Sequence, residues 1–336
     1  MTVLNVGYSD ERKTTLTSRP GLCPGTRGFR MVHTFTRVGA ALAVAVAGLA
    51  VAAPVVPVAA AATIYVSPSP PGTVLGSSCA LPNYNTIQGA VTASSSGDTI
   101  VVCPGTYVEQ VTVGKTLTLA GSGNAIVQAP GTLVADAAGK KNVVEVNNAA
   151  SVTMSGFTVA GPGPSSCGSI DTGIAVFGGA NLNLSNTTVR DIRDNPFSGC
   201  QNGEGIRIGT PRYSTTPDTG FATINDVNVY DYQKNAIVVA GSVGGVNSSA
   251  QITNTVTTGQ GPTPLIANNG IEVVNGATAS ISGSTIRDNF YTGTAKAVAC
   301  GLLIISASGV NNDNTNVYIG NQKNVCVHSK GGDFQP

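Results

Sequence analysis

The sequence predicts an all-β fold, a solenoid of the parallel β-helix type, and three observations carry that prediction. A short theme, a small residue followed by an apolar-any-apolar strand, recurs six times between Val143 and Ile304. The copies return about every 31 residues. Apolar residues within each copy alternate with period two, which is typical of strands, and not with the 3.6-residue period of helices. Coils of this kind bury their apolar face by stacking on their neighbours.

The theme marks the first strand of each coil. Counted from the first apolar position, the steps between copies are 30, 32, 31, 34 and 31 residues. A helical solenoid could have a similar period, but the apolar spacing and the many Val, Ile and Thr residues favour strands. The six copies are 143–146, 173–176, 205–208, 236–239, 270–273 and 301–304.

A second and a third strand follow the first in each of five coils. Their last inward residues are always five positions apart, so only a two-residue turn fits between them. The turn residues tolerate left-handed backbone or hydrogen-bond their own main chain, as such a turn requires. The predicted turns are Ser155-Gly156, Ser185-Asn186, Asn225-Asp226, Thr253-Asn254 and Ser282-Gly283.

Residues 63–131 are predicted to begin the solenoid. Thr63–Val66 has the pattern of a strand, and Tyr84–Ala93 has the apolar spacing of a short helix. Such a helix would cap the first coil and hide an edge that could otherwise pair with other chains. Three further strands are expected at 100–102, 111–113 and 117–119.

Residues 1–62 are expected to lie outside the mature domain. Met31–Arg37 is short and basic, Gly39–Ala53 is an apolar run, and Ala59–Ala62 offers an A-x-A cleavage site, which together indicate a secretory signal peptide. Residues 1–30 lack apolar periodicity, so we interpret them as a spurious extension with the true start at Met31. We therefore expect a secreted protein with a single parallel β-helix domain at 63–336.

A retained membrane anchor is the competing interpretation, because residues 39–62 carry no charge. Pro54 and Pro57 favour cleavage and hence no stable membrane insertion afterwards. The mature chain would hold 12 basic and 15 acidic residues, since six of the 18 basic and two of the 17 acidic residues lie in 1–62. A net charge near −3 for the mature chain gives no basic face for nucleic acid.

We also expect the mature protein to be a monomer.

Six cysteines remain in the mature chain, and an even number in an exported protein indicates disulfides. Fifteen pairings exist for six cysteines, and the repeat register narrows them. Cys167 and Cys200 lie in the loops after the third strand of consecutive coils and are expected to be bonded. The remaining pairs are then Cys79 with Cys103 and Cys300 with Cys326, each about one coil apart.

The N-terminal part of the domain resembles a known group of proteins. The segments 84–91 (YNTIQGAV), 97–102 (GDTIVV), 104–109 (PGTYVE) and 117–121 (LTLAG) are similar to the opening of secreted right-handed parallel β-helix proteins of the pectin-lyase-like superfamily. With the repeats, the resemblance covers nearly the whole mature chain. It implies a right-handed, single-stranded parallel β-helix, and it says little about activity.

The resemblance also implies where chemistry would occur, because sugar-processing members use the groove between the first strands and the loops after the third strands. The outward residues of the six first strands are Glu145, Ala175, Arg207, Val238, Glu272 and Leu303. Coils lie about 4.8 Å apart, so Arg207 is two coils from both Glu145 and Glu272. Their side chains could converge on one ligand.

The third-strand loops differ in length, and a short loop at 230–235 between longer ones predicts a notch. Tyr230, Asp231 and Lys234 would form its floor. Asp191 and Asp231 stand at the same offset on adjacent coils, where one carboxylate would raise the pKa of the other as a proton donor needs. Starting turns is the commoner role of such aspartates, and Asp288 repeats the offset. The expected wall comprises Asp191, Arg193, Asp194, Glu204 and Arg207.

We expect the protein to bind a polysaccharide and hypothesise that it processes it as a lyase, hydrolase or epimerase. Arg207, Lys234 and Arg193 would hold carboxylates, and Tyr230 and Tyr232 would pack on sugar rings. Asp191, Asp231, Glu204 and Glu272 are the candidate acids and bases. The alternative is a non-catalytic structural or adhesive β-helix protein at the cell surface.

Sequence motifs for other chemistry are missing. The paired-Asp motifs of polygalacturonases, the W-x-D-H segment of pectate lyases and the characteristic segments of pectin methylesterases do not occur. No C-x-x-C or Cys/His spacing supports a metal site, and no cofactor is expected. If an ion binds, calcium suits these oxygen-rich loops best, although no D-x-D-x-D-G run is present.

Overall fold

The computed structural model describes residues 60–328 except 69–75, 77, 166, 212–213, 215, 217 and 243–246. The expected extension and signal peptide fall almost wholly on residues 1–59, outside the described residues, as does the end of the predicted domain at 329–336. Within the described part, no helix is long and apolar enough to cross a membrane.

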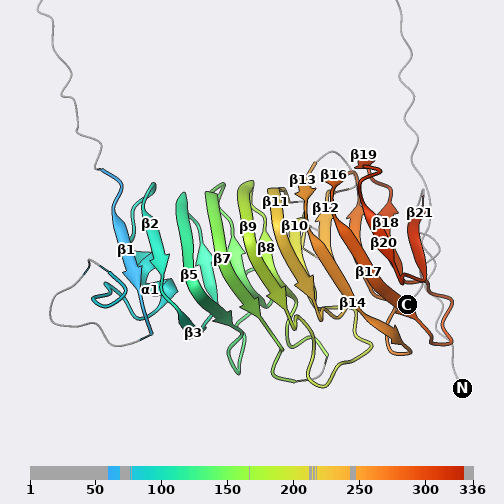
Figure 1. Ribbon diagram of the computed structural model, residues 1–336, viewed down its shortest axis with the longest axis horizontal. Helices are drawn as coiled ribbons and strands as arrows, with labels where there is room; N and C mark the ends of the chain where they lie inside the picture. Colours follow the sequence, from blue (N-terminus) through green and yellow to red (C-terminus); the bar gives the residue numbers. More distant parts are fainter. Residues whose placement is uncertain are drawn as a thin grey trace, which may run out of the picture. The chain divides into compact units, whose positions relative to one another are not determined.

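The described residues form a parallel β-helix whose coils stack along one axis (Figure 1). The first strands of the coils make an eight-stranded parallel sheet in the order β21-β18-β15-β12-β10-β8-β6-β4. Its central six strands are the six copies of the theme. The strands are β4 Val111–Val113, β6 Asn142–Val146, β8 Thr172–Val176, β10 Glu204–Gly209, β12 Asn235–Ala240, β15 Asn269–Val274, β18 Cys300–Ile305 and β21 Lys323–His328.

The second and third strands of the coils belong to a thirteen-stranded parallel sheet. In several coils the two expected strands run on as one bent strand, as in β7, β9 and β11. The strands are β1 Thr63–Val66, β2 Thr99–Val102, β3 Gly105–Val108, β5 Leu117–Gln128, β7 Ser151–Ala160, β9 Ala180–Arg190, β11 Gly220–Tyr230, β13 Ser249–Thr253, β14 Val256–Thr263, β16 Thr278–Ser282, β17 Thr285–Tyr291, β19 Gly309–Asn312 and β20 Val317–Ile319.

The predicted two-residue turns are confirmed. The second residue of each turn has a left-handed φ: 77° at Gly156, 45° at Asn186, 55° at Asp226, 50° at Asn254 and 59° at Gly283. Glycine reaches this region without steric cost, and Asn and Asp are the other residues that tolerate it best. The same bend is therefore repeated on five consecutive coils.

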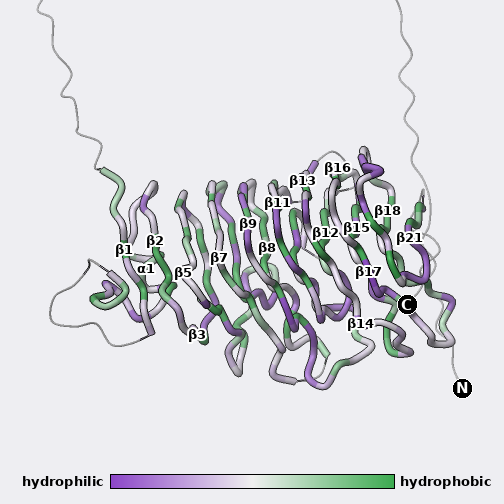
Figure 2. Tube along the Cα trace, viewed as in Figure 1, coloured by the Kyte–Doolittle hydropathy of each residue, from purple (hydrophilic) through white to green (hydrophobic). Residues whose placement is uncertain are grey.

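The small residue at the start of the theme has a steric cause. A Cβ atom built on Gly173, Gly205 or Gly270 would lie 2.6 Å from a carbonyl oxygen of the next coil. The inward apolar side chains that follow the small residue stack coil upon coil into the core. Figure 2 shows the hydrophobic colouring along these strands. One inward row comprises Val144, Ile174, Ile206, Ile237, Ile271 and Leu302, all buried.

The expected capping helix is present but shorter than its pattern. The helix α1 spans Ile87–Ala93, and the hydroxyl of Thr86 accepts a hydrogen bond from the Gly89 amide. It buries Ile87, Ala90 and Val91 against the first coil. It begins three residues after Tyr84 because Tyr84 pairs with β1 as extended backbone: its amide donates to the Tyr65 carbonyl at 3.2 Å and its carbonyl accepts from the Ser67 amide at 3.0 Å.

Three disulfides join Cys79 to Cys103, Cys167 to Cys200 and Cys300 to Cys326. These are the pairs expected from the repeat register. The second of them ties the loop that leads into β8 to the loop that leads into β10. Both loops border the face of the eight-stranded sheet, so this disulfide braces the surroundings of the site described next.

Candidate functional site

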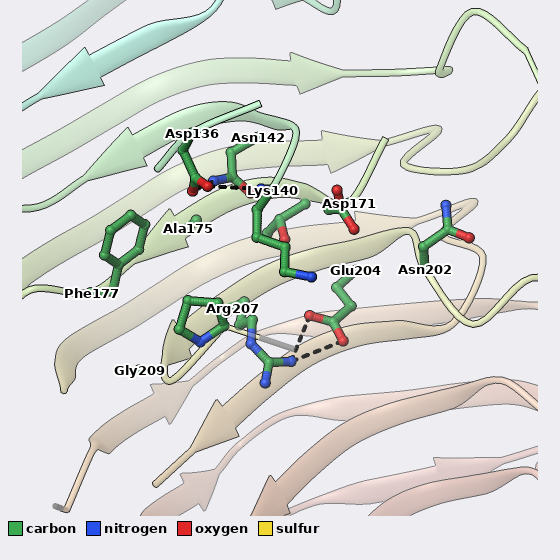
Figure 3. A pocket seen from close by; sticks show the side chains of 12 residues that line it. Asp136, Lys140, Asn142, Asp171, Ala175, Phe177, Asn202, Glu204, Arg207 and Gly209 are labelled. Atoms are coloured by element: carbon green, nitrogen blue, oxygen red, sulfur yellow. Dashed lines mark hydrogen bonds and ion pairs between the residues drawn. The ribbon is translucent and has the colours of Figure 1, made fainter. Parts of the chain in front are cut away.

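The outward face of the eight-stranded sheet contains a recess centred on Ala175. The strand pairing places Ala175 between Glu145 of β6 and Arg207 of β10. A methyl group between two long side chains leaves a gap, and the loops before β6, β8 and β10 wall it. Figure 3 shows the lining side chains. Its charged and aromatic members are Asp136, Lys140, Asp171, Phe177, Glu204 and Arg207.

Glu204 and Arg207 form a buried ion pair at one side of the recess. Nη1 of Arg207 lies 2.9 and 2.8 Å from the two carboxylate oxygens of Glu204, and Nε donates to the Thr210 carbonyl at 2.7 Å. Glu204 is only 1% exposed and Arg207 only 9%. Both were expected to act on a substrate, but here each first compensates the charge of the other.

Asp171 is the carboxylate of the recess best suited to proton transfer. One of its oxygens, Oδ2, accepts a hydrogen bond from the Lys141 amide at 2.9 Å, and Oδ1 has no hydrogen-bond partner among the described residues. Burial raises the pKa of Asp171, the nearby Glu204 carboxylate raises it further, and the Lys141 amide and Lys140 oppose that shift. An acid with a raised pKa holds its proton closer to neutral pH.

Glu145 and Asp136 lie next to each other beside the recess. The Asn142 amide joins them, donating to Asp136 at 3.0 Å and to Glu145 at 3.2 Å, while the Asn147 amide donates to Glu145 at 2.6 Å. Burial raises the pKa of Glu145, and the charge of Asp136 adds to that effect against the two amides. In Figure 3 the Lys140 amine points between Asp171 and Glu204.

Sequence reasoning missed Asp136, Asp171 and Phe177. Asp171 immediately precedes a first strand, and Phe177 immediately follows it, so both had a signal in their position relative to the theme. Asp136 had none, because its loop belongs to no repeat. Phe177 is partly exposed and lines the recess, where its ring could pack on a ligand.

The notch expected around residues 190–234 is two separate clusters. The recess does not include Asp191, Asp231 or Lys234. Asp191 and Asp231 instead meet at the turns after β9 and β11, where Arg193 lies 4.0 Å from the first carboxylate and 3.7 Å from the second. Arg190 also pairs with Asp191.

These aspartates have the turn conformation that was the alternative to a catalytic role. Asp191, Asp231 and Asp288 have φ values of 59°, 57° and 60°. Burial raises the pKa of Asp191, and the neighbouring Asp231 carboxylate raises it further, against the opposing effect of Arg190. The expected electrostatic coupling is therefore present, but away from the recess.

Two other predicted site residues have structural partners. Tyr232, expected on a sugar ring, is fully buried, and its hydroxyl donates to Oδ1 of Asn289 at 2.6 Å, so that expectation is wrong. Burial also raises its pKa. The Lys234 amine donates to the Ala267 carbonyl at 2.9 Å. Tyr232 turns back into the core three residues after the inward Val229, and the period-two alternation of the strand could not reveal this.

Asp194, expected on the wall of the notch, is fully buried. Its carboxylate accepts hydrogen bonds from the Ser198 hydroxyl at 2.6 Å, the Gln233 amide at 2.9 Å and the Asn202 amide at 3.1 Å. This network fixes the loop that carries Cys200. Asp194 therefore supports the wall of the recess and does not face solvent.

The remaining predicted residues stay on the surface. Tyr230 is partly exposed at the end of β11. Glu272 is partly exposed between Val238 and Leu303 of the neighbouring strands, and it has no hydrogen bond or ion pair within the described residues. It lies two strands from Arg207 on the same outward row. In the part of the chain that the structure describes, no group of three or more His, Cys, Asp or Glu could hold a metal.

Comparisons with known proteins find similarity only among solved structures. No family model matches the sequence, and no curated protein matches it. Pectate lyase Pel9A is 15% identical over 82% of this chain and 81% of that chain, with a TM-score of 0.49. The alginate lyase from Paenibacillus sp. str. FPU-7 is 15% identical over 71% and 96%, with a TM-score of 0.39. The pectin methylesterase from Aspergillus niger is 16% identical over 78% and 90%, with a TM-score of 0.41.

The chain is a parallel β-helix protein. Its own strand ladders establish that fold. At these identities and TM-scores, no catalytic residue or substrate is carried over from the similar structures.

Proposed function

We propose that this protein is a secreted, monomeric β-helix protein that binds a polysaccharide in the recess over Ala175 and acts on it by acid/base chemistry. The observation that carries the proposal is the recess itself, which combines an aromatic ring, Phe177, with the carboxylates of Asp136 and Asp171. Sugar rings bind through apolar faces packed on aromatic rings and through hydroxyl groups that donate to fixed acceptors.

The shape of the fold supports a polymeric ligand. The outward row from Glu145 to Leu303 runs along the solenoid axis, with one residue per coil and coils about 4.8 Å apart. Five residues of this row are buried and Glu272 alone is partly exposed, so a chain would reach the face at the recess and again at Glu272.

Asp171 is the proposed proton-transfer group in a lyase, hydrolase or epimerase type of reaction. Its raised pKa and its unpartnered Oδ1 suit a group that gives or takes a proton, and general acid/base catalysis contributes about 10²- to 10⁴-fold to rates. Glu204 holds Arg207 in place, and we assign it a positioning role. Asp191 and Asp231 lie too far outside the recess to act there.

Export is supported by the three disulfides, because such bonds persist in oxidising compartments. The signal peptide and the mature boundary at residue 63 remain proposals from the sequence. A non-catalytic surface protein would share the fold, the disulfides and the glycan contacts. Turnover is what separates the two functions.

The experiment is a binding and turnover assay on the full chain, exported into an oxidising compartment and purified. Affinity electrophoresis with neutral, amino-sugar and uronate polysaccharides measures binding, and reducing ends and unsaturated products measure turnover. We expect the protein to bind at least one polymer, and Asp171→Asn to lower turnover of that polymer at least 100-fold, a larger factor than any change in its binding. The matched control is Asp313→Asn, in the turn between β19 and β20, which should change neither.

Failure to bind every polymer would overturn the polysaccharide assignment. Binding without turnover in the wild-type chain would leave the non-catalytic alternative, and equal turnover in Asp171→Asn would remove Asp171 from the mechanism.

A further inference from the structure

We propose that the recess over Ala175 selects glycans that carry amino groups over glycans that carry carboxylates. This inference rests on the proposed function and names the substrate class of the same site. It differs from the expectation drawn from the sequence, in which basic residues would hold the carboxylates of an acidic polymer.

The lining of the recess carries more negative than positive charge. Three carboxylates, from Asp136, Asp171 and Glu204, face two cations, from Lys140 and Arg207. Directly beside the recess, Glu145 adds a fourth carboxylate and Lys141 a third cation, so carboxylates still outnumber cations by one. The site therefore has an excess of negative charge, and in a partly desolvated space an approaching uronate carboxylate would be repelled.

The positive charges of the site are already compensated by carboxylates of the same site. Arg207 has both oxygens of Glu204 within 2.9 Å of one guanidinium nitrogen. Lys140 interacts electrostatically with Asp171, and its amine points between Asp171 and Glu204 in Figure 3. A substrate carboxylate would have to compete with Glu204 and Asp171 for these cations.

Two side-chain oxygens of the recess, from Asp171 and Thr172, accept no hydrogen bond from a protein donor within the described residues. Oδ1 of Asp171 has no hydrogen-bond partner among the described residues. Thr172, next to it, lines the recess and is only 3% exposed, and its hydroxyl has no partner in the described part of the chain either. Neither oxygen is among the buried side-chain atoms that lack a hydrogen-bond partner, so both are open to solvent and to a ligand. An ammonium group supplies the donors that these oxygens lack.

Phe177 completes the site from the other side. Its partly exposed ring lines the recess opposite Asp171, as Figure 3 shows. An aromatic face attracts a cation as well as the apolar face of a sugar ring. A protonated amino sugar would thus meet a carboxylate on one side and a ring on the other.

The test compares three oligosaccharide series of equal length by isothermal titration calorimetry at pH 6. The probes are β-linked glucosamine oligomers, their fully N-acetylated counterparts and oligomers of galacturonate. We expect glucosamine oligomers to bind the full chain at least tenfold more tightly than either of the others. Because the attraction involves charge, that preference should weaken as salt increases.

Two variants locate the effect. Asp171→Asn should lower the affinity for glucosamine oligomers at least fivefold and leave the affinity for N-acetylated oligomers within twofold. Phe177→Ala should weaken both series, since it removes the ring and not the charge. Asp313→Asn, far along the solenoid, is the control and should match the wild type.

The outcomes are distinct from those of the first experiment. Equal affinity for glucosamine and N-acetylated oligomers, or tightest binding of galacturonate, would overturn the selectivity and leave the recess as a glycan site. Binding of none of the three series would overturn the selectivity and, together with failure on all polymers, the proposed function as well.

Discussion

Aspartates in equivalent sequence positions differ in chemistry according to what surrounds them. Asp191, Asp231 and Asp288 have the same offset from the core and the same left-handed backbone, so their backbone role is common. Asp191 and Asp231 lie beside each other and share Arg193, and Asp191 alone of the three also pairs with a second arginine, Arg190. Asp171, in a less regular position, has fewer partners and faces a recess. Local conformation is shared, whereas the availability of a proton depends on neighbours and burial.

The raised pKa of Asp191 predicts a pH-dependent effect of Asp191→Asn on stability. A carboxyl whose pKa is higher in the folded protein than in the unfolded chain costs stability as pH rises through both values. Replacing it with Asn, which tolerates the left-handed backbone, should raise Tm by about 1 to 2 °C at pH 7 and leave Tm unchanged at pH 3.

Thermal melts followed by circular dichroism at the two pH values measure this effect. Asp288→Asn is the matched control, with the same φ and its own arginine 3.8 Å away. A fall in Tm at pH 7 alone would show that the ion pairs of Asp191 outweigh its repulsion by Asp231, and an equal fall at both pH values would show a cost that is independent of its charge.

Each coil is specified by a few positions where side chains are restricted. The left-handed turn residue bends the chain between the second and third strands, and the small residue of the theme lets the first strand approach the next coil. The intervening positions need only be apolar inward. For this reason the strands were predicted well, although β7, β9 and β11 continue through bends that the sequence divides into two.

Gly205→Ala should destabilise the protein because its Cβ would lie 2.5 Å from Cγ1 of Val229 and 2.6 Å from the Ala236 carbonyl oxygen. Forcing a methyl group into such a packed contact costs about 1 to 3 kcal/mol of the free energy of unfolding. Urea unfolding measures the loss, and an unchanged slope would show that the denatured state is the same.

The control for that substitution is Gly131→Ala, in an exposed loop where an added Cβ meets nothing within 4 Å. It should change the free energy of unfolding by less than about 0.5 kcal/mol. If the two variants lost equal stability, the close approach of coils would not be the reason for the small residue.

The whole molecule depends on stacking, with reinforcement at the ends and beside the recess. The helix α1 covers the first coil, and the disulfides tie together segments that adjacent coils bring near. The loops that wall the recess contain no strand, and those before β8 and β10 rest on the buried Asp194 network and on the Cys167–Cys200 bond. The solenoid is therefore expected to tolerate loss of that bond better than the recess does.

Removing this disulfide with Cys167→Ser and Cys200→Ser should lower the free energy of unfolding by about 3 to 4 kcal/mol on a chain-entropy basis. The control is the double variant Cys300→Ser and Cys326→Ser, which removes a disulfide that closes a loop of similar length. Only the first double variant should also weaken glycan binding, because it releases the loop that leads to Asp171. Chemical denaturation and calorimetric binding test this, and equal loss of binding in both variants would refute it.

The sequence predicted the repeat, the strands, the turns and the cysteine pairs, because each of these depends on neighbours one coil away and recurs at a fixed period. It missed β21, where Val325 and Val327 follow no small residue and complete no further copy of the theme. It also merged two clusters into one notch, since residues 190–234 are adjacent in sequence whichever way their side chains point.

The tertiary structure alone decided which charged groups share a site. Asp136 and Asp171 come together with Glu204 because the loops before β6, β8 and β10 fold over the gap that Ala175 leaves. The carboxylate of Glu204 is buried and paired with Arg207, whereas Asp171 keeps one oxygen without a hydrogen-bond partner among the described residues. Desolvation and charge coupling are sums over neighbours in space, and a local pattern determines the scaffold without determining those sums.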